Sequence, residues 1–238
     1  MNKASGKREA ARRSAGTRSR QGWLIGGVAV LAILAAAYFI WPSLQPAVGV
    51  AEPQASDYAL ADGTALGPAD ARVVVQVFSD FQCPYCRQFA AGTERQVLEK
   101  YILAGRSVRL EYKHLIVIDG NVGGSESRHA AEASECAAEQ GLFWQYHDLV
   151  FANVQGEGTG SLRDERLRAL AATAGLDLTR FGTCFDTARY ARDVAADEAQ
   201  ALQLGVTGTP GVFVNEARVQ DFTDFAEVSG LIDAALGP

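Results

Sequence analysis

Two cysteines, Cys83 and Cys86, are separated by two residues in the run Cys-Pro-Tyr-Cys. Thiols at this spacing can close a small disulfide ring, or the second can resolve a mixed disulfide formed at the first. The same spacing supplies half of a tetrahedral zinc site, but such a site needs a second pair of Cys or His ligands. The other cysteines, Cys136 and Cys184, are single and far apart, and the three histidines form no pair. We therefore expect redox chemistry here, with no metal and no cofactor.

The segments on either side of this motif predict a strand followed by a helix. Residues 72–78 are nearly continuously apolar and rich in β-branched side chains, which is typical of a strand buried on both faces. After the motif, apolar residues recur at roughly helical spacing from Phe89 to Ile102. Pro84 suits the first turn of that helix, so we expect Cys83 at the positive end of the helix dipole, where a thiolate is favoured.

Three separate runs give the chain a resemblance to a known family. They are residues 78–86 (Phe-Ser-Asp-Phe-Gln-Cys-Pro-Tyr-Cys), 136–148 (Cys-Ala-Ala-Glu-Gln-Gly-Leu-Phe-Trp-Gln-Tyr-His-Asp) and 205–215 (Gly-Val-Thr-Gly-Thr-Pro-Gly-Val-Phe-Val-Asn). In this order they resemble the DsbA-like thiol:disulfide oxidoreductases of the thioredoxin superfamily, in the membrane-anchored branch. The resemblance covers about residues 57–238 and implies an α/β, thioredoxin-like fold with a helical domain inserted at about residues 125–204.

The proline at Thr209-Pro210 is the second chemical element. Most bonds before proline are trans in folded proteins, so the sequence by itself predicts a trans bond. The resemblance implies the opposite, a cis bond placed against Cys83. The backbone of this loop is then expected to pair with an extended substrate peptide.

The rest of the pattern agrees with the order of elements in that fold. Residues 108–114 alternate apolar and polar and predict a second strand, and residues 116–124 predict a loop. Helical patterns follow at about residues 127–139, from 143 onwards, and at 162–173, 177–185 and 187–204. Strand character returns at residues 211–214 and 217–222, and a closing helix is expected at 226–236. A short edge strand is expected around residues 58–60.

Residues 23–41 form an uncharged, apolar run. At about 1.5 Å per residue, a helix of this length comes close to spanning the ~30 Å hydrocarbon core of a bilayer. Trp23, Tyr38 and Trp41 stand where interfacial aromatic residues belong. Residues 1–22 hold seven Lys and Arg against a single acid, which predicts a cytoplasmic tail. We expect a single-pass anchor in a bacterial cell membrane, with the bulk of the chain outside the cytoplasm.

A cleaved signal peptide is the alternative to an anchor, because residues 35–37 are alanines that could be cut. The apolar run is longer than the usual core of such a peptide, so we favour an uncleaved anchor. Residues 42–56 contain three prolines and no periodicity, which predicts a semi-extended linker ahead of the domain at 57–238. The basic tail is explained as a topology signal, and no nucleic-acid binding is expected.

Cys136 and Cys184 both fall in the expected helical insertion, and three states are open to them. An extracytoplasmic location favours a structural disulfide, which would close a loop of about 47 residues and contribute about 3–4 kcal/mol in the chain-entropy model. The alternatives are two buried free thiols that act as small apolar residues, or a second redox pair.

Other polar residues are weaker candidates for a catalytic role. His147 is expected to be a packing or capping residue, and His114 ends a predicted strand. Members of the resembled family often carry a buried acid six residues before the first cysteine, where this chain has Val77. Glu111 or Lys113 on the neighbouring strand could substitute for that acid in deprotonating Cys86.

The function these features predict is the introduction of disulfides into exported polypeptides that carry free cysteines, with Cys83 attacked first. The pair Pro84-Tyr85 lacks the histidine of the strongest oxidants in the resembled family, so we expect a potential between about −120 and −230 mV. A membrane partner of the DsbB or VKOR type is expected to reoxidise the pair. The alternatives are a membrane-tethered reductase or isomerase, or a non-catalytic metal- or thiol-binding module.

Overall fold

The fold was examined in a computed structural model that describes residues 50–53 and 58–237. The expected tail and anchor, residues 1–22 and 23–41, lie outside the described residues. None of the helices in the described ranges has the length and hydropathy needed to cross a membrane.

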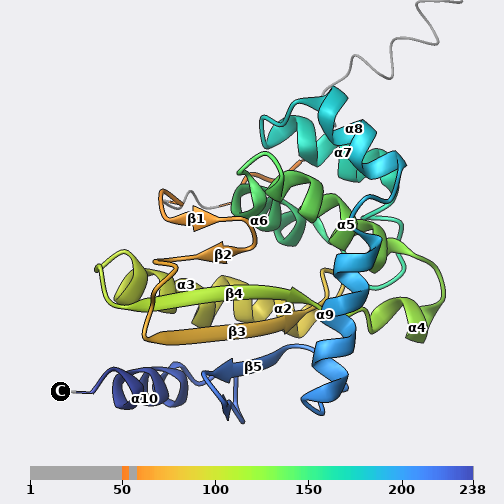
Figure 1. The fold of residues 1–238 in the computed structure, drawn as a ribbon. Coiled ribbons are helices and arrows are strands. Elements are labelled where there is room, and N and C mark those ends of the chain that lie inside the picture. Colours follow the sequence, from red (N-terminus) through yellow and green to blue (C-terminus); the bar gives the residue numbers. More distant parts are fainter. Residues whose placement is uncertain (1–49, 54–57, 238) are drawn as a thin grey trace, which may run out of the picture. The chain divides into compact units, whose positions relative to one another are not determined.

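In the part of the chain that the structure describes, the strands form one six-stranded sheet in the order β1-β2-β4-β3-β5-β6 (Figure 1). The central strands β3 (Val73–Ser79) and β4 (Val108–His114) are parallel, with Val73 opposite Val108 and Ser79 opposite His114. The other pairs are antiparallel. The side chains of β3 are buried or half-buried, as its continuous apolar run predicts. The remaining strands are β1 (Ala61–Asp62), β2 (Ala65–Leu66), β5 (Gly211–Val214) and β6 (Ala217–Arg218).

Two expectations about the outer strands were inaccurate. The first edge strands lie at β1 and β2, a few residues after the expected segment at 58–60. Strand β6 ends at Arg218, although strand character was expected through residue 222. Both of its residues are exposed, and the next residue, Val219, is buried as irregular chain.

The helix after the cysteine motif runs from residue 84 to residue 102 with two wide, π-type turns. It comprises α2 (Pro84–Phe89), a wide turn at Ala90–Glu94, α3 (Arg95–Val97) and a second wide turn at Leu98–Ile102. The buried face of this helix includes Phe89, Val97 and Tyr101, which join the core that β3 and β4 share. The closing helix α10 (Phe225–Leu236) contacts β3 and β5.

Six further helices lie between β4 and β5 and form the inserted part (Figure 1). In chain order they are α4 (Ile118–Val122), α5 (Glu126–Ala138), α6 (Phe143–Asn153), α7 (Asp164–Thr173), α8 (Leu178–Asp186) and α9 (Ala191–Gln203). Helix α4 replaces part of the loop expected at 116–124. The long helix α9 returns the chain from the insertion to the sheet, where it contacts β4. Trp144 Nε1 donates to the Ala65 carbonyl at 3.1 Å, which ties α6 to β2.

Part of the expected linker is held against the insertion. The Asn153 side chain accepts from Ala51 N at 2.8 Å and donates to Ala51 O at 2.9 Å. The backbone at residue 51 is thereby paired as it would be with another strand.

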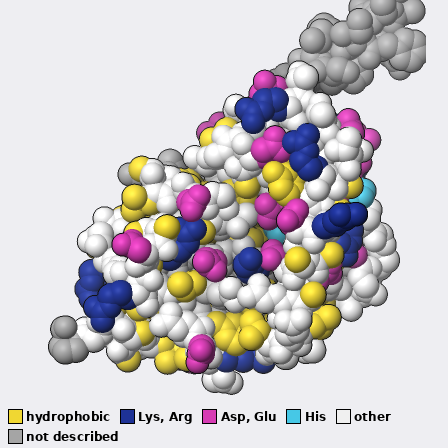
Figure 2. Space-filling view, in the orientation of Figure 1, with side chains coloured by type: hydrophobic (Ala, Val, Ile, Leu, Met, Phe, Trp, Pro, Cys, Tyr) yellow, Lys and Arg dark blue, Asp and Glu magenta, His cyan; other side chains and the backbone are white. Residues whose placement is uncertain are grey.

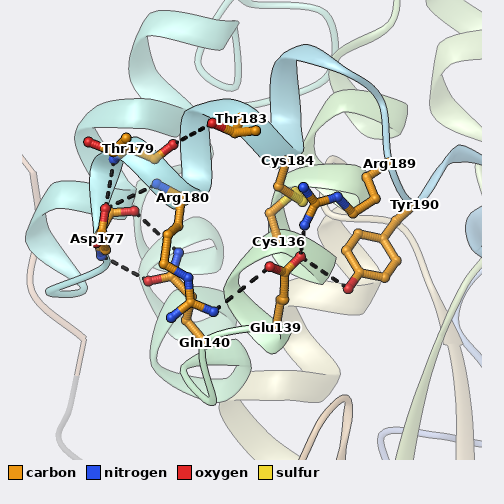
Figure 3. A network of polar contacts seen from close by, with 10 residues as sticks. All are labelled: Cys136, Glu139, Gln140, Asp177, Thr179, Arg180, Thr183, Cys184, Arg189 and Tyr190. Atoms are coloured by element: carbon orange, nitrogen blue, oxygen red, sulfur yellow. Dashed lines mark hydrogen bonds and ion pairs between the residues drawn. A yellow bond between two sulfur atoms is a disulfide. The ribbon is translucent and has the colours of Figure 1, made fainter.

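Cys136 and Cys184 form a disulfide that joins α5 to α8, with their Cα atoms 5.8 Å apart. Of the three states open to these cysteines, the structure has the bridge. Next to it, Glu139 pairs with Arg189 and lies 3.8 Å from Arg180, and Tyr190 donates to the same carboxylate (Figure 3). The Asp177 carboxylate caps the first turn of α8 by accepting from Thr179 N and Arg180 N.

Candidate active site

Cys83 lies at the junction of β3 and the long helix, as its flanking sequence predicts. It is the N-cap residue of α2, with Pro84 at the first helical position, so its side chain is next to the free amides of the first turn. The thiol is largely buried and donates to the Thr209 carbonyl with Sγ and O 3.3 Å apart.

The two thiols differ in acidity. The hydrogen bond from the Cys86 thiol lowers the pKa of Cys83 to about 6, and the Thr209 side chain and the amides of Tyr85 and Cys86 assist, against the effect of burial. Burial raises the pKa of Cys86 well above its ordinary value, and the neighbouring thiolate raises it further. At neutral pH the reduced pair therefore holds a thiolate at Cys83 and a proton at Cys86.

The loop between α9 and β5 closes the site over Cys83. The Thr209–Pro210 bond is cis, the isomer that the resemblance implies. Gly211 follows, and a Cβ atom there would lie 2.5 Å from Val206 Cγ1, so only glycine fits this approach. Gly211 is paired with Phe78 of β3, which fixes the loop beside the end of the strand that leads to Cys83.

Asp80 anchors the loop between β3 and α2. Its side chain is buried, and Oδ2 accepts from Val117 N and Ile118 N, each at 2.9 Å. Oδ1 accepts from Gln82 N at 2.9 Å and from the Ser127 hydroxyl at 2.6 Å. Four donors on three segments are thereby satisfied by one carboxylate, which fixes the cysteine loop to the insertion.

Gln82 makes a second connection to the insertion. Its amide donates to Asp119 Oδ1 at 3.0 Å and to Ser127 Oγ at 2.8 Å, and its Oε1 accepts from Gly158 N at 2.7 Å. Sequence reasoning assigned no role to Asp80 or Gln82. Their position in the run at residues 78–86 was the available signal, but their partners become neighbours only in the folded chain.

Tyr85, the second residue between the cysteines, is 59% exposed. Its ring meets Phe222 edge-on, with 6.2 Å between centroids, and Phe89 also meets Phe222 edge-on, at 6.4 Å. The dipeptide thus presents an aromatic surface next to Cys83.

Val77 is buried in β3, at the place where the resembled family often has an acid. Neither of the suggested substitutes reaches the thiols. Glu111 and Lys113 lie on the face of β4 opposite to Tyr112, since successive strand residues alternate. Glu111 accepts from Gln76 at 3.4 Å, and Lys113 pairs with Asp197 at 3.0 Å. The hypothesis that one of them deprotonates Cys86 is not supported.

His114, Glu135 and Asp197 are the group in the described ranges whose spacing could suit a metal ion, with ligand atoms within 4.8 Å of one another. Their own contacts account for this proximity. Asp197 accepts from the Lys113 ammonium and from His114 N, and Glu135 lies 3.2 Å from His114 Nε2.

Comparisons with known proteins agree with this geometry. The family model described as Thioredoxin matches residues 60–234. Among solved structures, oxidised BdbD from Bacillus subtilis superposes with a TM-score of 0.65 at 23% identity, covering 78% of this chain and 99% of that one. This likeness confirms the expected α/β fold with its helical insertion.

Two curated relatives differ in how much of their length the chain matches. Disulfide bond formation protein D of Bacillus subtilis is 25% identical over 174 residues, which are 72% of this chain and 76% of the relative. Na(+)/H(+) antiporter NhaA 3 of Salinispora tropica is 41% identical over 152 residues, which are 64% of this chain but 21% of the relative. The chain thus spans about a fifth of that antiporter. Together with the fold, these findings confirm the resemblance to DsbA-like thiol:disulfide oxidoreductases.

Proposed function

Because this chain belongs to the thioredoxin family, we propose that it is a protein thiol:disulfide oxidoreductase that introduces disulfides into exported polypeptides at Cys83 and Cys86. The observation that carries the proposal is the unequal acidity of the two thiols. Stabilising the Cys83 thiolate stabilises the reduced enzyme, and this makes its disulfide a stronger oxidant.

The reaction starts from the oxidised Cys83–Cys86 pair. A substrate thiolate attacks Cys83 Sγ, the enzyme disulfide breaks, and its electron pair goes to Cys86 Sγ. A second substrate thiolate then attacks the substrate sulfur of the mixed disulfide and releases Cys83 as a thiolate. Two electrons have passed from the substrate dithiol to the enzyme, and the substrate gains a disulfide.

Surface features next to Cys83 support a polypeptide substrate. Tyr85, two residues after Cys83, is exposed. Leu202 and Leu204, at the end of α9 and ahead of the loop of Thr209 and Pro210, are exposed as well. Figure 2 shows hydrophobic side chains gathered near β5, with charges of both signs elsewhere on that face. Unfolded polypeptides offer apolar side chains and an extended backbone that such a surface can bind.

We place the catalytic domain outside the cytoplasm, held by the anchor at residues 23–41, with the tail at 1–22 inside. A membrane protein of the DsbB or VKOR type would take the two electrons from reduced Cys83 and Cys86. The charge pattern and apolar run of the first 41 residues support this placement.

Oxidation of a reduced peptide with two cysteines tests the activity. The full-length chain in detergent, with Cys83 and Cys86 oxidised, should convert one peptide dithiol to a disulfide per enzyme. If the peptide stays reduced, or if reduced enzyme only cleaves peptide disulfides, a reductase is the better description. Metal retained stoichiometrically by a chain without exchange activity would indicate a binding module.

A further inference from the structure

A group of buried polar side chains lies in the core behind the reactive cysteines and has incomplete hydrogen bonding. Within the described ranges, the Tyr112 hydroxyl and His147 Nε2 are buried and have no hydrogen-bond partner. Glu94 is almost fully buried beside them. Desolvating such groups without partners costs stability, so native proteins keep few of them. Their grouping calls for a functional explanation.

The centre of this group is a glutamate facing a histidine. Glu94 Oε1 lies 3.7 Å from His147 Nε2. On the other side of the ring, Nδ1 lies 3.0 Å from Asp148 Oδ1, and Asp148 also accepts from the Tyr58 hydroxyl. With Nδ1–H donated to Asp148, Nε2 is available to share a proton with Glu94.

Glu94 belongs to the same continuous helix as Cys86. It ends the wide turn Ala90–Glu94, and such turns are frequent at functional sites. Both residues are buried, as are Phe89 and Thr93 between them on this helix, whereas position 91 is exposed. Cys86 and Glu94 thus lie on the same buried side of one continuous helix.

Tyr112 is the residue that relates Cys86 to the Glu94–His147 pair. Its ring centroid is 5.1 Å from that of His147. Burial raises the pKa of its hydroxyl, contact with Ser79 opposes this, and charge at Cys86 and at Glu94 raises the pKa further. Ser79 also contacts the Cys86 thiol. The Tyr112 hydroxyl therefore lies within electrostatic reach of both Cys86 and Glu94, and the Ser79 hydroxyl lies next to Cys86.

Cys86 needs a proton source of this kind. When its disulfide is broken, Cys86 leaves as a thiolate in a site where burial strongly favours the thiol. The usual acid is absent at Val77. The Asp80 carboxylate already accepts four hydrogen bonds, two from the backbone at Val117 and Ile118 and one each from Gln82 N and the Ser127 hydroxyl.

We propose that Glu94 and His147 form the proton store that protonates Cys86 when the Cys83–Cys86 disulfide is reduced, through the hydroxyls of Tyr112 and Ser79. The inference rests on the proposed function, because it supplies the proton for that reaction. As the electron pair reaches Cys86 Sγ, the neighbouring hydroxyl gives up its proton. Glu94 replaces that proton and is left as a carboxylate beside His147.

The acidity of the pair fits this task. Burial raises the pKa of Glu94 to about 7, His147 opposes the shift, and Asp148 adds to it. Burial by itself would lower the pKa of His147, but the carboxylates of Glu94 and Asp148 outweigh it and raise that pKa. Glu94 therefore both holds and releases a proton near neutrality.

Solvent can restore the proton from the far side of the pair. A cavity of about 20 Å³, enough for one water molecule, is lined by Glu94, Asp148, Tyr58 and Arg95. A more open groove of about 230 Å³ shares Arg95 and Asp148 with it. Among the described residues, Asp148, Tyr58 and Arg95 line this cavity with Glu94, and Tyr112 packs against the His147 ring.

The pH dependence of substrate oxidation tests the store. Single-turnover rates of the full-length oxidised chain with a dithiol peptide are measured from pH 5 to pH 9 for the native protein, Glu94→Gln and Glu94→Asp. Native enzyme should exceed Glu94→Gln by about tenfold or more below pH 7, and the two should converge by pH 9. Glu94→Asp should restore a pH-dependent ratio with a displaced midpoint. Glu132→Gln, at another buried carboxyl whose pKa burial raises, is the matched control and should follow the native profile.

A purely structural role for Glu94 would lower the rate by the same factor at every pH, and that result would overturn the inference. An infrared difference spectrum between oxidised and reduced chain gives a second readout, because a carboxyl band should change in native protein and vanish in Glu94→Gln. An unchanged band contradicts the store. If native enzyme fails to oxidise the peptide at all, the proposed function fails; if it does so and Glu94→Gln keeps the native profile, this inference alone fails.

Discussion

The chain holds two cysteine pairs whose surroundings give them opposite properties. Cys83 and Cys86 lie at the start of a helix under a proline loop, and one thiol has a pKa of about 6 while the other is raised. Cys136 and Cys184 are 48 residues apart and are bridged between two helices of the insertion. The first pair meets backbone amides and a carbonyl; the second is flanked by a fixed ion-pair network (Figure 3).

Loop length and local electrostatics give the two cysteine pairs different roles. A bridge that closes a long loop restricts the unfolded chain and so stabilises the fold. A bridge across two residues restricts very little, and its properties are set by how well each thiolate is stabilised. The first pair is therefore suited to exchange and the second to stability.

Replacing Cys83 should abolish the exchange activity of the reactive pair. Cys83→Ser removes the atom that substrate attacks, so disulfide exchange with a dithiol peptide should fall by about three orders of magnitude or more, in line with the loss of a covalent nucleophile. The rate of peptide oxidation by full-length protein measures this. Activity that survives in Cys83→Ser would show that another residue is the one that the substrate thiolate attacks.

Removing the other pair should have the reverse effect. Cys136→Ala with Cys184→Ala should lower the free energy of unfolding by about 3–4 kcal/mol, because the unfolded chain regains its freedom. Exchange activity should stay within about twofold of the native rate. Denaturant unfolding and the peptide assay on the same samples check both expectations. A large loss of activity in fully folded protein would make this pair a redox relay.

Asp80 should matter to both stability and reactivity, since it fixes the reactive loop to the insertion. Asp80→Ala leaves the amides of Val117 and Ile118 and the Ser127 hydroxyl without their acceptor. We expect the free energy of unfolding to fall by about 2–3 kcal/mol, because buried donors would be left without an acceptor. Asp70→Ala, at an exposed acid, is the control. Equal stability of the two variants would show that the carboxylate does not fix the loop.

The acidity difference between Cys83 and Cys86 should appear as a pH dependence. Alkylation of Cys83 in the reduced chain should rise through a midpoint near pH 6, whereas Cys86 should resist at the same pH values. Since the pKa of Cys83 is lowered from 9.0, its contribution to folded stability is full above about pH 9 and is lost as the pH falls through about 6. Mass spectrometry of alkylated peptides resolves the two sites. A midpoint near pH 9 would show that the pKa of Cys83 is not lowered, and the proposed difference between the two cysteine pairs would lose its basis.

The sequence predicted those parts of the molecule that depend on local pattern. The buried strand, the helix starting at Pro84 and the order of the inserted helices follow from hydrophobic period and from proline and glycine positions. The cysteine motif was identified from spacing and residue type alone. Strand β6 was predicted too long. Val219, the apolar residue after it, is buried as irregular chain and does not extend the strand.

The parts that depend on contacts distant in sequence were not predictable. Asp80 and Ser127 come together only when α5 packs on the cysteine loop, and an aspartate in a loop has no pattern that reveals this. Glu94 was hidden for the same reason, because its partner His147 follows 53 positions later on α6 and its burial is set by the wide turn in the helix. Periodicity describes one element at a time.

The reduction potential of Cys83 and Cys86 in the full-length chain tests the central claim most directly. The protein in detergent is equilibrated in glutathione buffers and quenched by alkylation, with Cys136 and Cys184 scored separately. The account predicts a value between about −120 and −230 mV, and one above about −200 mV would place the enzyme among the oxidants. A value at or below about −270 mV, where thioredoxin lies, would contradict disulfide donation and favour a reductase.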